Sequence, residues 1–509
     1  MSDESDSAKL DQPLARWTKR AIDPTLIKAL GSGAFFHDAI GEQVMDRWLE
    51  AALAYIPSYL DYQVRMQHHP GCVVAVAQRN KVIFEHAFGF ANMASGETMT
   101  PRHRFRVASH SKSFTAAGVM KLREQNKVHL DARAGDYVKG LHKQSAQARI
   151  GQLLSHSAGF VRDGLDSGYF LDRRPFFNER ELIADLANLP PSIEAGTRFK
   201  YSNHGYGLLG QVIATVTGEP YNDWIRREIV DAVGLTETAP DMPIDRSAPF
   251  ASGHTGEFPL GRRAVIPGKM LAHALSSATG FVSTAADLAL FFNQLSPASK
   301  RSILSAESRR EMTRRHWRNP DTALEGYYGL GTINGSVDGW TWFGHSGAMP
   351  GYITRTATLV EPDVTVSILT NAIDGWSGFW MDSVFSILRA FERSGAPTRQ
   401  VRDWTGRWTS MWRAIDLVPM ADKVMMAMPS TLFPFANAGE LRVNKRDLAQ
   451  ISRAEGFGSF GEPVRRVRKR GKVAEVWLGS AKCIPERELG NEIKSRYRLA
   501  AANRQASES

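Results

Sequence analysis

A serine and a lysine stand three residues apart in Ser109-His-Ser-Lys112. If this run opens a helix, the two side chains share one face. A serine hydroxyl acts as a nucleophile only with a base within hydrogen-bonding reach, and a lysine serves when burial or a neighbouring cation lowers its pKa. The helix N-terminus also offers backbone N–H groups where an oxyanion would form. The pair therefore indicates acyl transfer through Ser109, although a single Ser-x-x-Lys match also arises by chance in a chain of this length.

Two further motifs carry polar groups that such a reaction needs. In Tyr201-Ser-Asn203, the tyrosine could move a proton between serine, lysine and leaving group, and the asparagine could donate to a substrate carbonyl. In His345-Ser-Gly347, the glycine permits close backbone approach, and the N–H of Ala348 could complete an oxyanion hole with that of the serine. Taken singly, the first motif also fits a packed tyrosine in a surface turn, and the second fits a histidine that caps a turn.

The order and separation of the three motifs resemble those of the serine β-lactamase and penicillin-binding-protein superfamily. More narrowly, the chain resembles the class C β-lactamase-related group, which includes DD-peptidases, D-aminopeptidases and family VIII esterases. The resemblance covers roughly residues 40–390. It extends to three further strings: Leu153-Leu-Ser-His-Ser-Ala-Gly-Phe160, Thr279-Gly-Phe-Val-Ser-Thr-Ala-Ala-Asp287 and Tyr328-Gly-Leu-Gly331.

The resemblance implies a role for each motif residue. Ser109 is expected to be the nucleophile, Lys112 the base or its partner, and Tyr201 the proton shuttle, while Asn203 contacts the substrate. His345 stands where class C β-lactamases have the lysine of Lys-Thr-Gly, and a partly neutral histidine attracts a substrate carboxylate less strongly. We therefore expect a hydrolase without cofactor or metal that acts on amides and peptides with D-residues, or else on small esters, with little or no β-lactamase activity.

The elements around the motifs predict an α+β fold. A helical pattern that Pro57 is expected to end precedes a strand at 72–77, and residues 110–300 have mostly helical patterns. Strand patterns return at 341–343, 353–360 and 364–370. The resemblance implies a β-lactamase/transpeptidase-like fold, in which an antiparallel sheet is flanked by helices and a helical subdomain.

Near Gly395-Ala-Pro-Thr398 the pattern changes to short β-type runs separated by Gly, Pro and Asn. Such runs predict a small all-β domain, either a barrel or a sandwich. With Asp416-Leu-Val-Pro and the string at 455–463, this region resembles the lipocalin-like modules attached to some members of the group. A module of this kind could limit substrate size at the active-site mouth or simply pack and stabilise. We expect an N-terminal extension, a serine hydrolase domain and this C-terminal domain, at residues 1–40, 41–395 and 396–509.

The composition is that of a soluble globular protein, with 509 residues, 43% of them hydrophobic and 23% charged. No apolar stretch approaches the roughly 20 residues that span a bilayer, so no membrane contact is expected. The acidic N-terminus lacks a leader pattern, which predicts a cytoplasmic protein. Cys72 and Cys483 stand far apart without metal-ligand neighbours, so a disulfide framework is not expected.

A basic run at 465–470 contributes to the formal net charge of +10. Because Gly471 follows it as a turn signal and no aromatic residues are interleaved for base stacking, we interpret the run as a solvated hairpin rather than a nucleic-acid site. The expected partner is a small-molecule or short-peptide substrate. The oligomeric state is left open.

Three other interpretations of the sequence compete with this one. The run Gly-His-Ser-Gly-Ala around Ser346 approaches the nucleophile elbow of α/β-hydrolases, but it ends in alanine. A metallohydrolase would need a ligand pattern that His68, His69 and His156 do not form. A penicillin-binding-like receptor, whose acyl-enzyme does not turn over, uses the same motifs and stays open.

Overall fold

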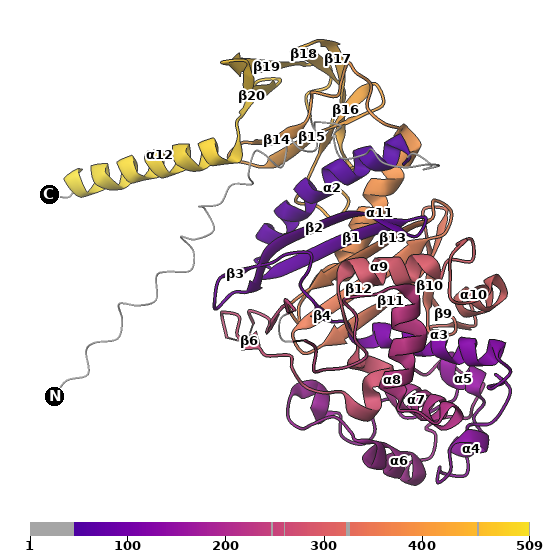
Figure 1. Cartoon of the computed structure of the whole chain (residues 1–509). Helices are drawn as coiled ribbons and strands as arrows, with labels where there is room; N and C mark the ends of the chain where they lie inside the picture. Colours follow the sequence, from indigo (N-terminus) through magenta and orange to yellow (C-terminus); the bar gives the residue numbers. More distant parts are fainter. Residues whose placement is uncertain (1–44, 246–247, 259, 322–325, 456–457, 508–509) are drawn as a thin grey trace, which may run out of the picture.

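The computed structural model of the protein describes residues 45–245, 248–258, 260–321, 326–455 and 458–507. The expected N-terminal extension, residues 1–40, lies outside the described residues. Figure 1 shows a large part built on one sheet with helices on both faces, and a small barrel that lies against one side of it. This arrangement confirms the predicted α+β fold class with an all-β C-terminal domain.

A nine-stranded antiparallel sheet organises the large part. In spatial order its strands are β3 (Glu97–Thr98), β2 (Lys81–Asn92), β1 (Gly71–Gln78), β13 (Val364–Thr370), β12 (Tyr352–Leu359), β11 (Trp340–Met349), β10 (Ile333–Val337), β9 (Tyr327–Tyr328) and β8 (Trp317–Arg318). The apolar run of β1 is buried on both faces: Val73 and Ala75 belong to one core, and Val74 and Val76 to the other. The sheet thus separates two hydrophobic cores.

Helices cover both faces of this sheet (Figure 1). Helices α2 (Arg47–Met66) and α11 (Ser377–Ser394) pack together on one face. The helical region on the other side contains α3 (Ser111–Glu124), α4 (Ala134–Tyr137), α5 (Ile150–Leu154), α6 (Glu179–Asn188), α7 (Asn203–Thr217), α8 (Tyr221–Ile225), α9 (Ala285–Gln294) and α10 (Ala306–Thr313). Among the described helices, none combines the length and the apolar character needed to cross a bilayer.

The prediction that Pro57 ends the first helix is wrong, because α2 continues through it to Met66. A proline inside a helix removes one backbone hydrogen bond and crowds the preceding turn. Beyond the proline, however, Tyr59, Leu60 and Val64 are buried in the core that α2 shares with α11. This burial of apolar surface outweighs the local cost.

The C-terminal domain is an eight-stranded antiparallel barrel. Its strands are β14 (Gly406–Thr409), β15 (Ala414–Met420), β16 (Lys423–Ala427), β17 (Gly439–Lys445), β18 (Leu448–Arg453), β19 (Pro463–Lys469), β20 (Lys472–Leu478) and β21 (Ala481–Cys483). Thr409 and Ile484 exchange backbone hydrogen bonds of 2.8 and 2.9 Å, which bring the first strand to the last. Helix α12 (Glu486–Ser507) follows and extends away from the barrel (Figure 1). Because α11 ends at Ser394, we propose the boundary between the two domains at residue 395.

The basic run forms most of β19 and the first residue of the turn to β20, which lies at Arg470 and Gly471. Arg468 pairs with Asp447 at 2.9 Å, and Lys469 pairs with Glu475 at 3.0 Å. Acidic neighbours therefore neutralise part of the run. The expected hairpin is present, but Arg466 within it is buried, so the run is not wholly solvated.

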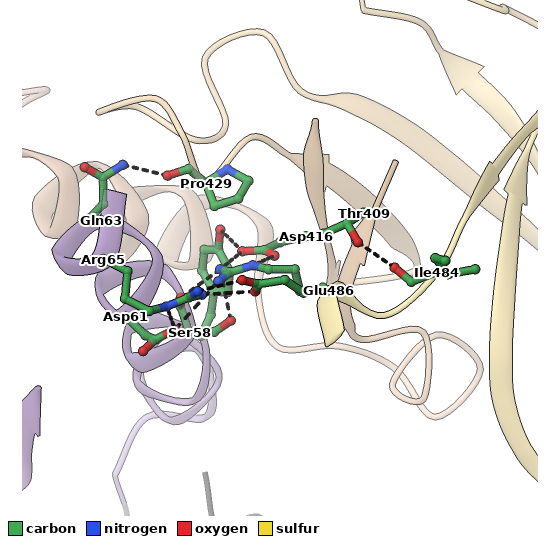
Figure 2. A network of polar contacts seen from close by, with 11 residues as sticks. Ser58, Asp61, Gln63, Arg65, Thr409, Asp416, Pro429, Ile484 and Glu486 are labelled. Atoms are coloured by element: carbon green, nitrogen blue, oxygen red, sulfur yellow. Dashed lines mark hydrogen bonds and ion pairs between the residues drawn. The ribbon is translucent and has the colours of Figure 1, made fainter. Parts of the chain in front are cut away.

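The barrel and the start of α12 are attached to α2 by polar contacts (Figure 2). Gln63 donates to the carbonyl oxygen of Pro429 at 2.6 Å, and Arg65 pairs with Glu486 at 2.6 Å. Tyr55 donates to Asp416 at 3.2 Å. The module therefore packs on the face of the sheet that α2 and α11 cover.

Candidate active site

Ser109 lies in a short 3-10 turn, Ala108–His110, that leads directly into α3. Ala108 just before it has a φ of 47°, a conformation that a non-glycine residue seldom adopts. The side chain of Ser109 is partly exposed, whereas Lys112 in the first turn of α3 is fully buried. Their spacing places Lys112 Nζ 3.2 Å from Ser109 Oγ. The turn thus exposes the Ser109 hydroxyl to solvent, while the buried amine of Lys112 approaches it from the protein interior.

Two carbonyl-type oxygens hold the amine of Lys112. Its Nζ donates to Asn203 Oδ1 at 2.6 Å and to the backbone oxygen of Ala278 at 2.8 Å. Burial lowers the pKa of Lys112 well below its usual value, against an opposing effect of the carboxylate of Asp163. A neutral amine can make both donations with its two hydrogens, because these oxygens only accept. Its lone pair is then left for the Ser109 hydroxyl.

Tyr201 approaches the same hydroxyl from the segment before α7. Its phenol donates to Ser109 Oγ at 2.9 Å. Ser202 caps α7 by accepting from the N–H of Gly205, which fixes the chain beside the tyrosine. The ring of His156 lies 4.2 Å from the Tyr201 ring, and burial raises the pKa of the phenol. The phenol therefore stays protonated and available as a donor.

Asn203 is itself held by Asp163. Its Nδ2 donates to Asp163 Oδ1 at 2.6 Å, and the other oxygen of this carboxylate pairs with Arg162 at 3.0 Å. This contact orients the amide so that Oδ1 faces Lys112. A carboxamide has two N–H donors, so one remains for a substrate carbonyl.

The third motif lies on β11, which forms a wall beside the nucleophile. β10 pairs with β11 as far as Gly344, whereas β12 pairs with it to Met349. A Cβ on Gly347 would lie 2.2 Å from the backbone oxygen of Val107, so only glycine lets the strand come this close to the turn before Ser109. Ala348 is exposed. The β11–β12 hairpin closes in a two-residue turn, so Met349 and Tyr352 next to the turn form a hydrogen-bonded pair. Hydrogen-bonded and non-hydrogen-bonded pairs alternate along an antiparallel ladder, so the N–H of Ala348 is directed away from β12.

His345 is buried next to this cluster rather than exposed to solvent. Its Nε2 is 2.9 Å from the hydroxyl of Tyr328, and its ring lies 6.1 Å from that of His110. Burial lowers the pKa of His345 well below its usual value, so the ring is neutral. The structure thus brings Ser109, Lys112 and Tyr201 together and places His345 against Tyr328.

Four groups at the site were missed by the sequence reasoning. They are the ring of His156, the carboxylate of Asp163, the backbone oxygen of Ala278 and the hydroxyl of Tyr328. His156 and Tyr328 belong to the strings that carried the family resemblance, so the signal was present without a role. Asp163 lies outside those strings and its spacing to the motifs gives no signal. Ala278 lies in a π-helical segment, Ser276–Gly280, that presents its carbonyl to the lysine.

Two alternative interpretations can be compared with the structure. Ser346 lies within the antiparallel strand β11 and not in a strand-to-helix turn, so the α/β-hydrolase interpretation is wrong. Within the described residues, no group of three or more His, Cys, Asp or Glu side chains could hold a metal ion.

Comparison with known proteins adds independent findings. A protein-family model described as beta-lactamase matches residues 45–376. The chain is 28% identical over 324 residues to penicillin-binding protein 4 of Amycolatopsis lactamdurans, covering 60% of this chain and 82% of that protein. It is also 23% identical over 205 residues to protein flp of Staphylococcus aureus (strain N315), of which it spans only 40%.

Solved structures with this fold include three informative neighbours. The octameric penicillin-binding protein homologue from Pyrococcus abyssi matches with a TM-score of 0.59 and 21% identity, covering 85% of this chain and all of that chain. SurE matches with a TM-score of 0.54 and 22% identity over 86% of this chain and 99% of its own. D-amino acid amidase from Ochrobactrum anthropi SV3, complexed with D-phenylalanine, matches with a TM-score of 0.57 and 22% identity, covering 67% of this chain and 99% of that chain. At these identities the likeness concerns the fold.

Proposed function

Because the chain belongs to the beta-lactamase family and is a serine hydrolase of the β-lactamase-related type, we propose that it forms an acyl-enzyme on Ser109 and hydrolyses amides of D-amino acids and short peptides. One observation carries the proposal. Lys112 Nζ and the Tyr201 phenol both lie within hydrogen-bonding distance of Ser109 Oγ, at 3.2 and 2.9 Å.

Acylation begins with transfer of the Ser109 proton to the neutral amine of Lys112. The freed oxygen attacks the substrate carbonyl carbon and forms a tetrahedral intermediate. The N–H groups of Ser109 and Ala348 donate to its oxyanion, and one N–H of Asn203 orients the adjoining amide. Tyr201 then gives its phenolic proton to the leaving amine and recovers one from Lys112, so that the bond to the leaving group breaks and the amine departs neutral.

In deacylation, water is the attacking group, Lys112 is again the base, and Ser109 Oγ is the leaving group. Water gives a proton to the neutral Lys112, and its oxygen attacks the ester carbonyl of the acyl-enzyme. The intermediate collapses, the bond between the carbonyl carbon and Ser109 Oγ breaks, and Lys112 returns its proton to that oxygen. The products are a carboxylic acid and free enzyme, and no cofactor enters the balance.

The proposed substrate class follows from the charge of the site. A neutral, buried His345 offers no cation for the carboxylate that a β-lactam carries, so antibiotic hydrolysis should be weak. The structural likeness to an enzyme titled D-amino acid amidase supports amides of D-amino acids as the first class to test. Small esters remain the second, because acyl transfer needs the same machinery.

The Ser109→Ala variant tests the proposal. Wild-type protein and variant are assayed on D- and L-aminoacyl p-nitroanilides, p-nitrophenyl esters and nitrocefin. We expect the loss of the nucleophile to lower kcat at least about a thousandfold, with an unchanged thermal midpoint. A fluorophosphonate probe followed by mass spectrometry should label Ser109, and activity that survives in the variant would contradict the assignment.

A receptor that binds penicillin without turnover is the second candidate. The resemblance to a protein named penicillin-binding protein 4 favours it. A stoichiometric burst of product without a steady state would support this candidate over the hydrolase.

A further inference from the structure

We propose that a pocket next to Ala348 receives the side chain on the acyl side of the substrate and selects an apolar, uncharged group. The inference rests on the proposed function and names the substrate class of that site. The pocket has a volume of about 280 Å³. Its apolar lining is made of Ile266, Pro267, Met270, Met349 and Pro350.

The lining of the pocket includes the residue that follows the proposed oxyanion donor Ala348. Met349, which forms part of its wall, directly follows Ala348 on β11. The sulfur of Met349 accepts a hydrogen bond from Thr279 at 3.7 Å, and Thr279 follows Ala278, whose carbonyl holds Lys112. Further lining comes from Ile266 at the end of β6 (Val265–Ile266) and from the segment that follows, 267–270. A substrate bound at Ser109 and following β11 past Ala348 therefore reaches this pocket.

The position of the proton donor decides which half of the substrate faces the pocket. The ring of Tyr201 lies 4.2 Å from His156, which lies 4.7 Å from Tyr328. Tyr328 in turn contacts His345, at the opposite end of this part of β11 from Met349. Because Tyr201 protonates the leaving group, the leaving group lies toward His345. The acyl side chain then points toward Met349.

The lining defines the chemistry of that side chain. The two charged residues of the pocket, Asp172 and Lys269, are exposed and of opposite sign, so they give its mouth no net charge. An ionised side chain would lose its hydration on entering an apolar floor without a paired charge. A branched aliphatic or aromatic side chain gains by leaving water. The pocket therefore favours acyl groups such as D-leucyl or D-phenylalanyl over D-alanyl or D-glutamyl.

A substitution within the lining, with the next residue as control, tests this inference. D-Ala, D-Leu, D-Phe and D-Glu p-nitroanilides share one leaving group, so their kcat/KM values compare acyl side chains alone. We expect the wild type to prefer D-Leu and D-Phe by about tenfold or more. Ile266→Trp fills the pocket and should lower kcat/KM for these two about tenfold while changing D-Ala less than twofold. Val265→Trp, one residue earlier and outside the lining, should leave the preference unchanged.

The outcomes separate the pocket from the proposed function. Equal losses on all four substrates in Ile266→Trp, or a wild type without side-chain preference, would overturn the pocket while leaving the hydrolase intact. If Ile266→Trp instead changes the preference between leaving groups, measured with D-leucine amide and D-leucyl p-nitroanilide, the pocket receives the leaving group and the proposal is overturned. A wild type that turns over none of these substrates and whose Ser109 reacts with no fluorophosphonate would overturn the proposed function, and the pocket with it.

Discussion

Asp163 lies two hydrogen bonds from the amine that we propose as the base. It accepts from Asn203, which accepts from Lys112. Its negative charge favours the protonated form of Lys112 and so opposes the lowering of that pKa by burial. Asp163→Asn removes the charge, so the pKa of Lys112 should fall further and the neutral amine should persist to lower pH. We predict that the acid limb of the kcat/KM profile moves to lower pH, with a loss of about tenfold at the optimum from weaker orientation of Asn203.

The control for this prediction is Asp166→Asn. Asp166 belongs to the same loop but pairs with Arg174 and with the N–H of Gly168. Its removal should leave the acid limb in place. An acid limb that is the same in wild type and Asp163→Asn would contradict the electrostatic link, even if activity fell.

The motif residues were predictable from the sequence because helix geometry fixes Ser109 and Lys112 on one face. Asn203 was singled out by its distance from Tyr201 in the motif. Asp163 was not, since its contact with Asn203 joins segments 40 residues apart and depends on how the loop folds back. The partner of His345 was equally out of reach, because the hydroxyl of Tyr328 comes from a different strand. Their catalytic roles remain predictions.

At the scale of elements, the close contact between β11 and the turn before Ser109 is made possible by Gly347. In Gly347→Ala the new Cβ would lie 2.2 Å from the backbone oxygen of Val107, and backbone cannot yield as a flexible side chain can. Either β11 or the turn must move, which displaces one oxyanion donor from the other. We expect kcat/KM to fall about a hundredfold. Gly378→Ala at the start of α11 meets no atom within 4 Å and should change neither activity nor stability appreciably. Wild-type activity in Gly347→Ala would show that the wall is not needed.

Element positions followed from the sequence where burial makes the pattern continuous. The strands at 72–77 and 364–370 match β1 and β13 to within a residue at each end. By contrast, β11 runs from Trp340 to Met349, well beyond the predicted 341–343. Gly344 and Gly347 interrupt its β-type pattern, and its pairing with β12 supplies what local propensity lacks.

At the scale of the whole molecule, the sheet lies between the barrel and α3, the helix that follows Ser109 (Figure 1). Barrel residues Val418 and Met425 share a core with α2 and α11, whereas Phe114 of α3 belongs to the core on the other face. The structure therefore favours the packing interpretation of the module over the one that places it at the active-site mouth. The sequence left both open, because the contacts that decide between them join residues more than 350 positions apart, as in Tyr55 with Asp416.

A buried ion pair between Arg407 of β14 and Asp416 of β15 lies at this interface, where the barrel meets α2. Arg407 donates to both oxygens of Asp416, at 2.7 and 2.8 Å, and to the carbonyl of Ser58 on α2 at 2.7 Å. The two side chains are only 11% and 3% exposed. In Arg407→Ala the carboxylate stays buried without its partner, so we expect the free energy of unfolding to fall by about 3–5 kcal/mol.

The same change should leave catalysis intact, because the barrel lies across the sheet from Ser109. We expect urea unfolding followed by tryptophan fluorescence to show the lower midpoint, while kcat/KM measured below the transition stays within twofold of wild type. Arg65→Ala is the matched control: its pair with Glu486 also joins α2 to the barrel side, but the side chains are 34% and 52% exposed. Such a pair contributes about 0–1 kcal/mol, so its midpoint should barely move. A selective loss of activity in Arg407→Ala, at full stability, would mean that the barrel acts on the active site through α2 and the sheet rather than by stabilising the fold.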